Sequence, residues 1–143
     1  MPSAQRSIVV DRPIEEVFAF FSDPGNDQRW RPHVKEIRAD GPVSAGARIH
    51  QVVAGPGGRG IPADIEVTSY EPPRHYAFSV VAGPARPTGE FQFARAGSGT
   101  QVTFALSAEL SGFKAMMMGR AVQKSMDGEM AALDKAKGLI EGT

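Results

Sequence analysis

The chain has 143 residues, 16 basic and 16 acidic side chains, and no cysteine. This balance gives neither the electrostatic footprint of a nucleic-acid binder nor a polybasic attraction to anionic lipid, and without cysteine there is no disulfide framework, thiolate nucleophile or cysteine zinc site. The length is typical of one self-sufficient domain, which we assign to residues 1–143.

Neither a targeting segment nor a membrane span is indicated. The stretch from Met1 to Ser7 lacks the apolar core of a signal peptide, and no uninterrupted apolar run reaches the roughly 18 residues of a transmembrane helix. We therefore expect a soluble, cytoplasmic protein with no membrane insertion and no nucleic-acid partner.

The first elements are predicted to be a strand, a helix and a short second helix. Residues 5–10 form a β-branched run. Asp11 and Pro13, followed by two acids, are typical of a helix start in which Asp11 supplies the capping oxygen. An Asp-Pro pair then begins a short helix that would end at Trp30, because Pro32 follows.

From Val34 onward the apolar period falls to two, and turn residues divide this region into about six strands. One face of these strands is predicted to be buried and the other wet. The predicted inward residues are Ile49, Val53, Ile65, Val67, Phe78, Val80, Phe91, Phe93, Val102, Phe104 and Leu106. Short turns between consecutive strands predict an antiparallel meander, with the N-terminal strand added to it.

The last element is predicted to be an amphipathic helix from about Phe113 to Ile140. At 100° per residue its apolar side chains form one stripe: Ala115, Met118, Val122, Met126, Leu133, Ala136 and Ile140. Such a helix would be about 40 Å long. We expect it to lie across the sheet, with the stripe facing the strands.

Glu129 interrupts the centre of this stripe. A carboxylate that faces the sheet must be hydrogen-bonded, paired with a cation or protonated to avoid a large desolvation penalty. Two interpretations remain open. Glu129 forms a structural ion pair with a strand arginine such as Arg48 or Arg95, or it is a functional carboxylate in a pocket.

Several segments, in this order, resemble the START-like superfamily (also called SRPBCC or Bet v 1-like), in particular its polyketide cyclase/dehydrase and lipid-transport branch. These segments are SIVVDRPIEEVF (residues 7–18), SDP (22–24), WRPHV (30–34), YEPPR (70–74), GTQVTF (99–104) and the long terminal helix. The resemblance covers nearly the whole chain.

The resemblance implies an α+β helix-grip fold. In that fold a curved seven-stranded antiparallel sheet wraps around the C-terminal helix, two short helices lie between strands 1 and 2, and a hydrophobic cavity is enclosed. Members of the superfamily include ligand carriers, hormone receptors, cyclases and chaperone activators. They share no catalytic residues that can be assigned to positions in this sequence. The resemblance therefore predicts the fold but says much less about the activity.

Known catalytic and metal motifs find little support. Residues 55–60 spell G-x-G-x-x-G, but a strand rather than a helix is predicted to follow, so we interpret them as a hairpin tip near the cavity mouth. The histidines His33, His50 and His75 lack metal-ligand spacing, and no G-x-S-x-G elbow is present. We expect no metal and no cofactor.

The candidate ligand-binding residues are Trp30, Gln51, Phe78, Phe91, Phe93, Met118, Val122, Met126 and Glu129. Gln51 is predicted to face inward, where a backbone carbonyl or a ligand would pair with it, whereas His50 faces water. For Trp30 we favour a plug whose indole nitrogen bonds a backbone oxygen over direct ligand stacking. Met130 is predicted to be core, and Met116 and Met117 fit either a lid or a homodimer contact.

Three functions follow from these observations. The first is non-catalytic binding of a small hydrophobic molecule, lipid- or polyketide-like, between sheet and helix. The second is a cyclase or dehydratase in which a pocket acid, with Glu129 as the weak candidate, moves protons on a polyketide-like substrate. The third is a protein-interaction module, which an exposed apolar patch at Met116 and Met117 would indicate.

Overall fold

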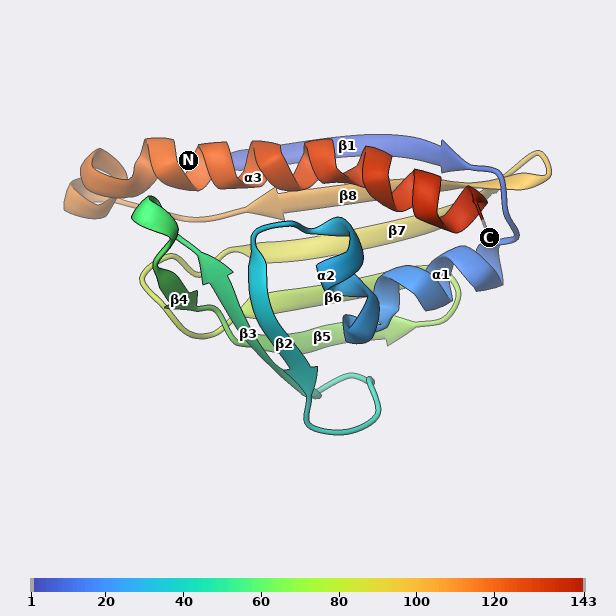
Figure 1. Ribbon diagram of the computed structural model, residues 1–143, viewed down its shortest axis with the longest axis horizontal. Coiled ribbons are helices and arrows are strands. Elements are labelled where there is room, and N and C mark those ends of the chain that lie inside the picture. Colours follow the sequence, from blue (N-terminus) through green and yellow to red (C-terminus); the bar gives the residue numbers. More distant parts are fainter. Residues whose placement is uncertain (1, 143) are drawn as a thin grey trace.

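An antiparallel sheet curls around one long helix in the computed structural model, which describes residues 2–142 (Figure 1). The strands are β1 Ser3–Val10, β2 Val34–Ala39, β3 Arg48–Ala54, β4 Gly60–Pro62, β5 Ile65–Glu71, β6 His75–Val80, β7 Thr88–Ala96 and β8 Gly99–Ser107. The helices are α1 Ile14–Ser22, α2 Asp27–Trp30 and α3 Gly112–Glu141, with short 3-10 turns at Pro24–Asn26 and Pro56–Gly58.

The sheet has the predicted topology. Its strand order is β1-β8-β7-β6-β5-β3-β2, and every pairing is antiparallel. The meander and the added N-terminal strand are therefore confirmed, as is the helix-grip fold. The short strand β4, which pairs with the end of β3, was not expected.

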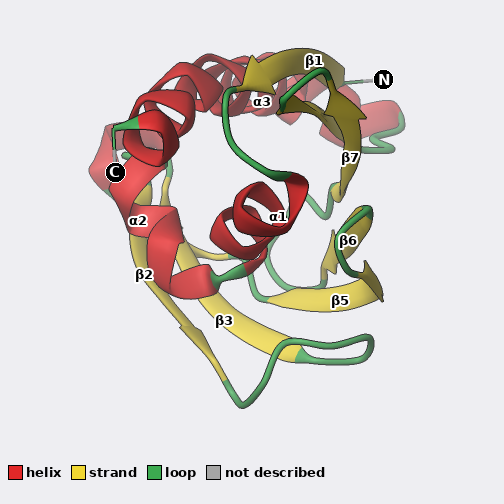
Figure 2. Ribbon diagram, turned by 90° about the vertical axis from the view of Figure 1, so that its right-hand side faces the viewer, coloured by secondary structure: helices red, strands yellow, loops and turns green. Residues whose placement is uncertain are grey.

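The elements between β1 and β2 cover the open side of the curl (Figure 2). Asp23 caps the 3-10 turn Pro24–Asn26 that leads directly into α2, because its carboxylate accepts a hydrogen bond from the Gly25 N–H at 2.9 Å. The predicted cap at Asp11 is wrong: Pro13 occupies the N-cap position of α1 and makes no side-chain cap bond. Asp11 instead donates its backbone N–H to Glu141. The beginning of α1 is thus held by the end of α3.

The concave face of the sheet carries the core, and the predicted strand phase is confirmed. The inward residues of β7 and β8, among them Phe91, Phe93 and Phe104, are buried. The rings of Phe91 and Phe104 stack with centroids 4.1 Å apart. Phe78 lies on the same face, against Gly89, where a Cβ atom would stand 2.2 Å from the ring.

The long helix runs along β1 at one side of the sheet (Figure 1). Its C-terminal part is buried as predicted, including Met126, Met130, Leu133 and Ile140. The prediction of one continuous buried stripe is wrong, because Ala115 is exposed and Met118 and Val122 are only half-buried. Among residues 2–142, no helix is both long and apolar enough to cross a membrane.

Candidate functional site

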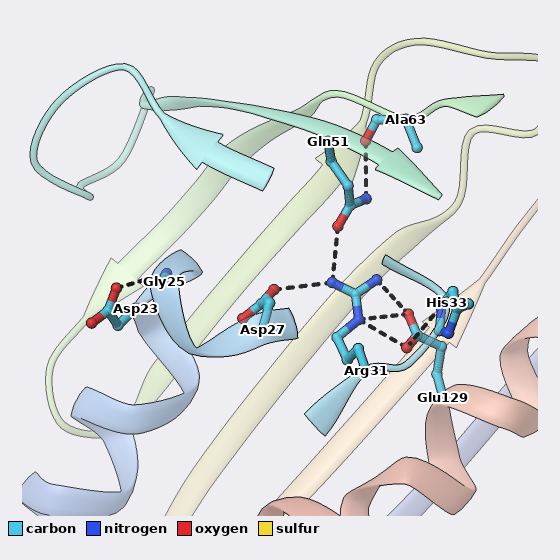
Figure 3. A network of polar contacts seen from close by, with 8 residues as sticks. All are labelled: Asp23, Gly25, Asp27, Arg31, His33, Gln51, Ala63 and Glu129. Carbon is cyan, nitrogen blue, oxygen red and sulfur yellow. Dashed lines mark hydrogen bonds and ion pairs between the residues drawn. The ribbon is translucent and has the colours of Figure 1, made fainter. Parts of the chain in front are cut away.

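A buried polar cluster lies between α2, α3 and β3 (Figure 3). Arg31 follows the last residue of α2, and Asp27 is the first residue of that helix. Glu129 comes from the middle of α3, and Gln51 comes from the concave face of β3. The cluster therefore joins the small helices, the long helix and the sheet.

Arg31 and Glu129 form the centre of the cluster. Arg31 Nε donates to Glu129 Oε1 at 2.9 Å, and Arg31 Nη2 donates to Glu129 Oε2 at 2.7 Å. Glu129 is only 7% exposed. The pair has the parallel two-bond geometry in which guanidinium and carboxylate bind most strongly. His33 adds a contact, with Nε2 3.3 Å from Glu129 Oε1.

The expected partners of Glu129 are wrong. Arg48 lies near Glu66, at 3.7 Å, and Arg95 pairs with Glu15, at 3.0 Å. Both arginines are on exposed parts of the sheet surface, whereas the cation that neutralises Glu129 comes from a loop 98 residues earlier in the chain. The interpretation of Glu129 as part of a structural ion pair holds, with Arg31 as its partner.

Arg31 also binds the two other members of the cluster. Its Nη1 atom donates to Asp27 Oδ2 at 3.0 Å and to Gln51 Oε1 at 2.8 Å. Gln51 in turn donates from Nε2 to the Ala63 carbonyl at 3.1 Å. The backbone partner expected for Gln51 is therefore present, and the predicted outward position of His50 is also confirmed.

The pKa values of the two acids around Arg31 are shifted in opposite directions. Burial opposes ionisation of Glu129, but the charge and hydrogen bonds of Arg31 and His33 outweigh it and lower the pKa to about 2. Burial raises the pKa of Asp27 to about 6, and Arg31 offsets this only in part. Glu129 is thus a permanent anion near neutral pH, and Asp27 is the acid whose proton can be exchanged there.

Next to the cluster lies a small internal cavity. It is lined by Phe21, Asp27, Trp30, Arg31, Ile37, Ile49, Ile65, Tyr76, Phe78, Phe91, Phe104 and Glu129. The free space is about 20 Å³, which is room for roughly one water-sized group. In this conformation the space between sheet and helix is therefore almost filled by aromatic side chains.

Trp30 lines this cavity, and, among the described residues, its indole N–H lacks the hydrogen bond that we expected. It is 1% exposed and packs edge to face against Phe21, with ring centroids 5.4 Å apart. The predicted bond from the indole nitrogen to a backbone oxygen is wrong: within the described part of the chain, Nε1 is buried and has no hydrogen-bond partner. A buried donor without an acceptor is uncommon in folded proteins.

The structure brings only some of the predicted ligand-binding residues together. Four of them line the cavity: Trp30, Phe78, Phe91 and Glu129. Gln51 does not line it but is hydrogen-bonded to Arg31, which does. Phe93 and Met126 are buried in the core but do not line the cavity. Met118 and Val122 lie on the half-exposed early part of α3. Asp27 and Arg31 were missed, although their i, i+4 spacing at a helix end is a recognisable ion-pair signal.

A larger hollow of about 680 Å³ lies on the opposite, outer face of the sheet. Its lining is dominated by small and polar side chains, such as Ser79, Thr88 and Ser107. Near it, a chain of contacts crosses three strands, with Ser69 Oγ 2.7 Å from His75 Nδ1 and His75 Nε2 2.5 Å from Glu90 Oε2. We interpret these contacts as cross-strand stabilisation of the sheet.

The G-x-G-x-x-G stretch forms a hairpin tip, as predicted. Residues 56–58 make a single 3-10 turn between β3 and β4, and a strand follows. The tip therefore lacks the helix N-terminus that receives a phosphate in dinucleotide-binding folds.

Comparisons with known proteins agree with this architecture. A model of the family described as "Polyketide cyclase / dehydrase and lipid transport" matches residues 1–137. A search of the curated proteins gave no significant match.

Solved structures with the same fold share little sequence with this chain. TTHA0849 from Thermus thermophilus has a TM-score of 0.81 at 19% identity, covering 99% of this chain and 98% of that chain. A START superfamily protein from Mycobacterium smegmatis has a TM-score of 0.78 at 16% identity, covering 98% and 97%. Ara h 8.0201 has a TM-score of 0.75 at 10% identity, covering 99% and 98%. At these identities the similarity establishes the fold alone.

Proposed function

Because the chain belongs to the polyketide cyclase/dehydrase and lipid transport family, we propose that it binds a small hydrophobic molecule between the concave face of the sheet and α3. Family and fold together are those of a START-like, hydrophobic-ligand-binding domain. The observation that supports this function most directly is the inner cavity, whose wall is largely aromatic and whose polar groups are confined to one cluster.

The cavity must enlarge to accept such a ligand. Sites for small molecules usually measure about 300–1,000 Å³, whereas the free space here is about 20 Å³. The groups best able to move are half-buried: Phe78 on β6, and Met118 and Val122 on the early part of α3. The Arg31–Glu129 pair would stay fixed and hold the rest of the helix on the sheet.

Ligand retention tests this function directly. Mass spectrometry under native conditions, followed by extraction in organic solvent, should identify a hydrophobic molecule carried by the purified protein. Delipidated protein should then gain thermal stability from a panel of lipids and aromatic polyketides, because a ligand that binds only the folded state raises Tm. No extracted molecule and no Tm increase across the panel would refute ligand binding.

Acid–base catalysis is a second candidate function, and Asp27 is the observation that favours it. Asp27 lines the cavity, and burial raises its pKa to about 6, close to the range in which a general acid or base works best. Glu129, the acid proposed from the sequence, is less suitable because its pKa is lowered to about 2. The catalytic hypothesis therefore moves from Glu129 to Asp27.

The test is turnover of a linear polyketide-like substrate by wild type and by Asp27→Asn. Asparagine keeps the side-chain shape but cannot transfer a proton, so turnover should fall at least 100-fold, roughly the lower end of general acid–base contributions, while substrate binding is retained. Equal turnover by the two proteins would remove this candidate.

A further inference from the structure

The unpartnered indole N–H of Trp30 carries an inference about the ligand. Its Nε1 is the only buried side-chain nitrogen or oxygen without a hydrogen-bond partner among the residues whose side chains are described. Trp30 borders the inner cavity, and the free space there suits one oxygen atom. A hydrogen-bond acceptor placed in this cavity beside the indole nitrogen would satisfy that donor.

The charges around the cavity restrict what the acceptor can be. Arg31 directs its Nε and both terminal nitrogens at Glu129, Asp27 and Gln51. Its positive charge is therefore already balanced by Glu129, and Asp27 adds a second acid beside the same space. A ligand carboxylate or phosphate would meet two acids and no free cation in this cluster, whereas a neutral oxygen has no charge for the acids to repel and can accept a hydrogen bond from the Trp30 N–H.

We propose that the ligand is a hydrophobic molecule with a neutral oxygen acceptor at its buried end, such as a ketone, an ester carbonyl or a hydroxyl, and that this oxygen accepts a hydrogen bond from Trp30 Nε1. This inference rests on the proposed ligand-binding function. Trp30 is then the residue that selects the polar end of the ligand, and the aromatic wall holds its apolar body.

Three naphthalenes of matched size test the proposal: 2-acetylnaphthalene, 2-ethylnaphthalene and 2-naphthoate. The ketone should bind about 5- to 10-fold more tightly than the ethyl compound, the factor that one net hydrogen bond provides. The carboxylate should bind most weakly. Because Trp30 is the sole tryptophan, a ¹⁵N-labelled sample gives one indole N–H resonance, which the ketone should shift downfield and the ethyl compound should not.

Trp30→Phe is the variant that separates the indole donor from the aromatic wall. It should lose the preference for the ketone while it still binds 2-ethylnaphthalene. The wild-type indole resonance gives an independent answer if the variant does not fold. Equal affinities for ketone and ethyl compounds, with an unmoved resonance, would overturn the assignment to Trp30 and leave the hydrophobic site intact. No binding of any of the three would instead refute the proposed function.

A different observation, at the start of α3, supports a second inference. Phe113, Met116 and Met117 are 74%, 82% and 66% exposed, and we call these three residues the apolar patch. Figure 1 shows this orange end of α3 reaching past the strands at one end of the molecule. The exposure is the signal expected of an interaction surface.

The charged residues on α3 next to the apolar patch are all basic. Residues 112–125 include Lys114, Arg120 and Lys124 but no acid. The positive end of the helix dipole adds to them, because the first turn has no acidic residue and the N-cap residue Ser111 makes no side-chain cap bond. Lys114 also contacts the β6–β7 loop, which contributes Arg86. The nearest acid in the sequence is Glu109, three residues before the helix.

These charges decide between possible occupants. A symmetric dimer through this surface would place the cations of one copy against those of the other. Three side chains also fall well short of the roughly 800 Å² that each partner contributes to a standard protein interface. A flat anionic surface avoids both difficulties, since it attracts the cations and accepts protruding apolar groups.

We infer that the start of α3 docks on an anionic lipid surface. This revises the expectation drawn from the balanced charge of the whole chain, because the basic and acidic residues are distributed unequally along α3. Docking here concerns the membrane surface and does not involve a spanning segment.

Co-sedimentation with vesicles tests the docking. The protein should bind vesicles of phosphatidylcholine with about 30% phosphatidylglycerol and not vesicles of phosphatidylcholine alone, and added salt should weaken binding. Lys114→Glu should reduce binding at least fivefold, the effect of about 1 kcal/mol per charge. The matched control Lys135→Glu changes an exposed lysine of the same helix outside this region and should have no effect.

Met116→Ser combined with Met117→Ser should also reduce vesicle binding, because it removes apolar groups without changing charge. Equal binding to neutral and anionic vesicles, or equal losses from Lys114→Glu and Lys135→Glu, would overturn the proposal. Binding to an acidic peptide such as polyglutamate without binding to anionic vesicles would overturn it in favour of a protein partner.

Discussion

The two parts of α3 differ in how they are held, although one apolar period runs through both. From Met126 to Glu141 the helix is buried on one side and tied to β1 at several points. Arg6 donates to the Met130 carbonyl at 2.9 Å, and Lys137 donates to the Val9 carbonyl at 2.7 Å. From Gly112 to Ser125 the ties are weaker: Gln123 bonds the backbone of Ser3, and Lys114 reaches Pro84.

The lengths of strand and helix explain this difference. β1 has 8 residues and spans about 26 Å, which matches about 18 residues of a helix that rises 1.5 Å per residue. α3 has 30 residues, so its first part extends beyond the strand. A periodic stripe therefore predicts which side of a helix can be buried, and the length of the partner decides how much of it is buried.

The largest effect should come from removing the ion pair at the anchored part. Glu129→Ala leaves the Arg31 guanidinium buried beside only Asp27 and Gln51. Removing one partner of a buried pair typically destabilises by about 3–5 kcal/mol. Urea unfolding monitored by circular dichroism measures the loss. The double variant Arg31→Met/Glu129→Leu should be less destabilised than the sum of its single variants, and a strictly additive result would contradict this role of the pair.

Truncating one residue in each part of α3, both on the same apolar stripe, should show how differently the two parts contribute to stability. Leu133 is fully buried, so Leu133→Ala should destabilise by about 2–5 kcal/mol through lost contacts and the cavity left behind. Met118 is half-buried, and Met118→Ala should remove only about 1 kcal/mol. Unfolding midpoints of the two variants at equal m-value give the comparison. Similar losses at both positions would mean that the early part of α3 is packed as firmly as the rest.

The opposite pKa shifts of Asp27 and Glu129 predict a pH dependence of stability. Asp27 has a raised folded-state pKa, about 6, so its contribution is full below its ordinary value of 3.8 and is lost as pH rises through about 6. Glu129 has a lowered pKa, about 2, so its contribution is full above 4.5 and is lost as pH falls through about 2.

Between about pH 4.5 and 6.5, Asp27 is therefore the member of this pair that titrates. Its ionisation should lower the free energy of unfolding by about 1–3 kcal/mol across this range. Measuring the difference between wild type and Asp27→Asn at both pH values isolates the effect from other titrating groups. A difference that does not change with pH would show that Asp27 has an ordinary proton affinity.

The link between Gln123 and Ser3 should matter locally more than globally. Gln123→Ala removes two exposed hydrogen bonds to the Ser3 backbone, at 3.1 and 2.7 Å, and should reduce global stability by at most about 1 kcal/mol. Amide hydrogen exchange by mass spectrometry should nevertheless become faster in residues 113–122. Exchange that accelerates equally through residues 130–140 would mean that α3 opens as one unit.

The smallest effect is expected at the apolar patch. Met117→Ser replaces a side chain that is mostly in water, so stability should change by less than about 0.5 kcal/mol. Met130→Ser, the same substitution at a buried position of α3, should be strongly destabilising. Thermal unfolding of the two variants measures both effects. A large loss of stability in Met117→Ser would place that residue in the core.

The sequence was sufficient for features that depend on local chemistry. Asp23 and Pro24 predicted the short second helix, and alternating Phe91 and Phe93 predicted the inward face of β7. Features that depend on residues far apart in the sequence could not be predicted from it. Arg31 and Glu129 are 98 residues apart, and nothing in the spacing around Glu129 distinguishes Arg31 from Arg48 or Arg95. Likewise, the lone state of the Trp30 N–H depends on the positions of its neighbours in space.

The pairing of β1 has a consequence for synthesis of the chain. β1 leaves the ribosome about 90 residues before its strand partner β8 (Gly99–Ser107), and its helix partner α3 follows only after that. Until β8 and α3 have been synthesised, one edge of β1 and the apolar residues Ile8 and Val10 lack the elements that cover them in the folded protein. Closure by such distant contacts is slow. We therefore expect the nascent chain to depend on chaperone protection until α3 has emerged.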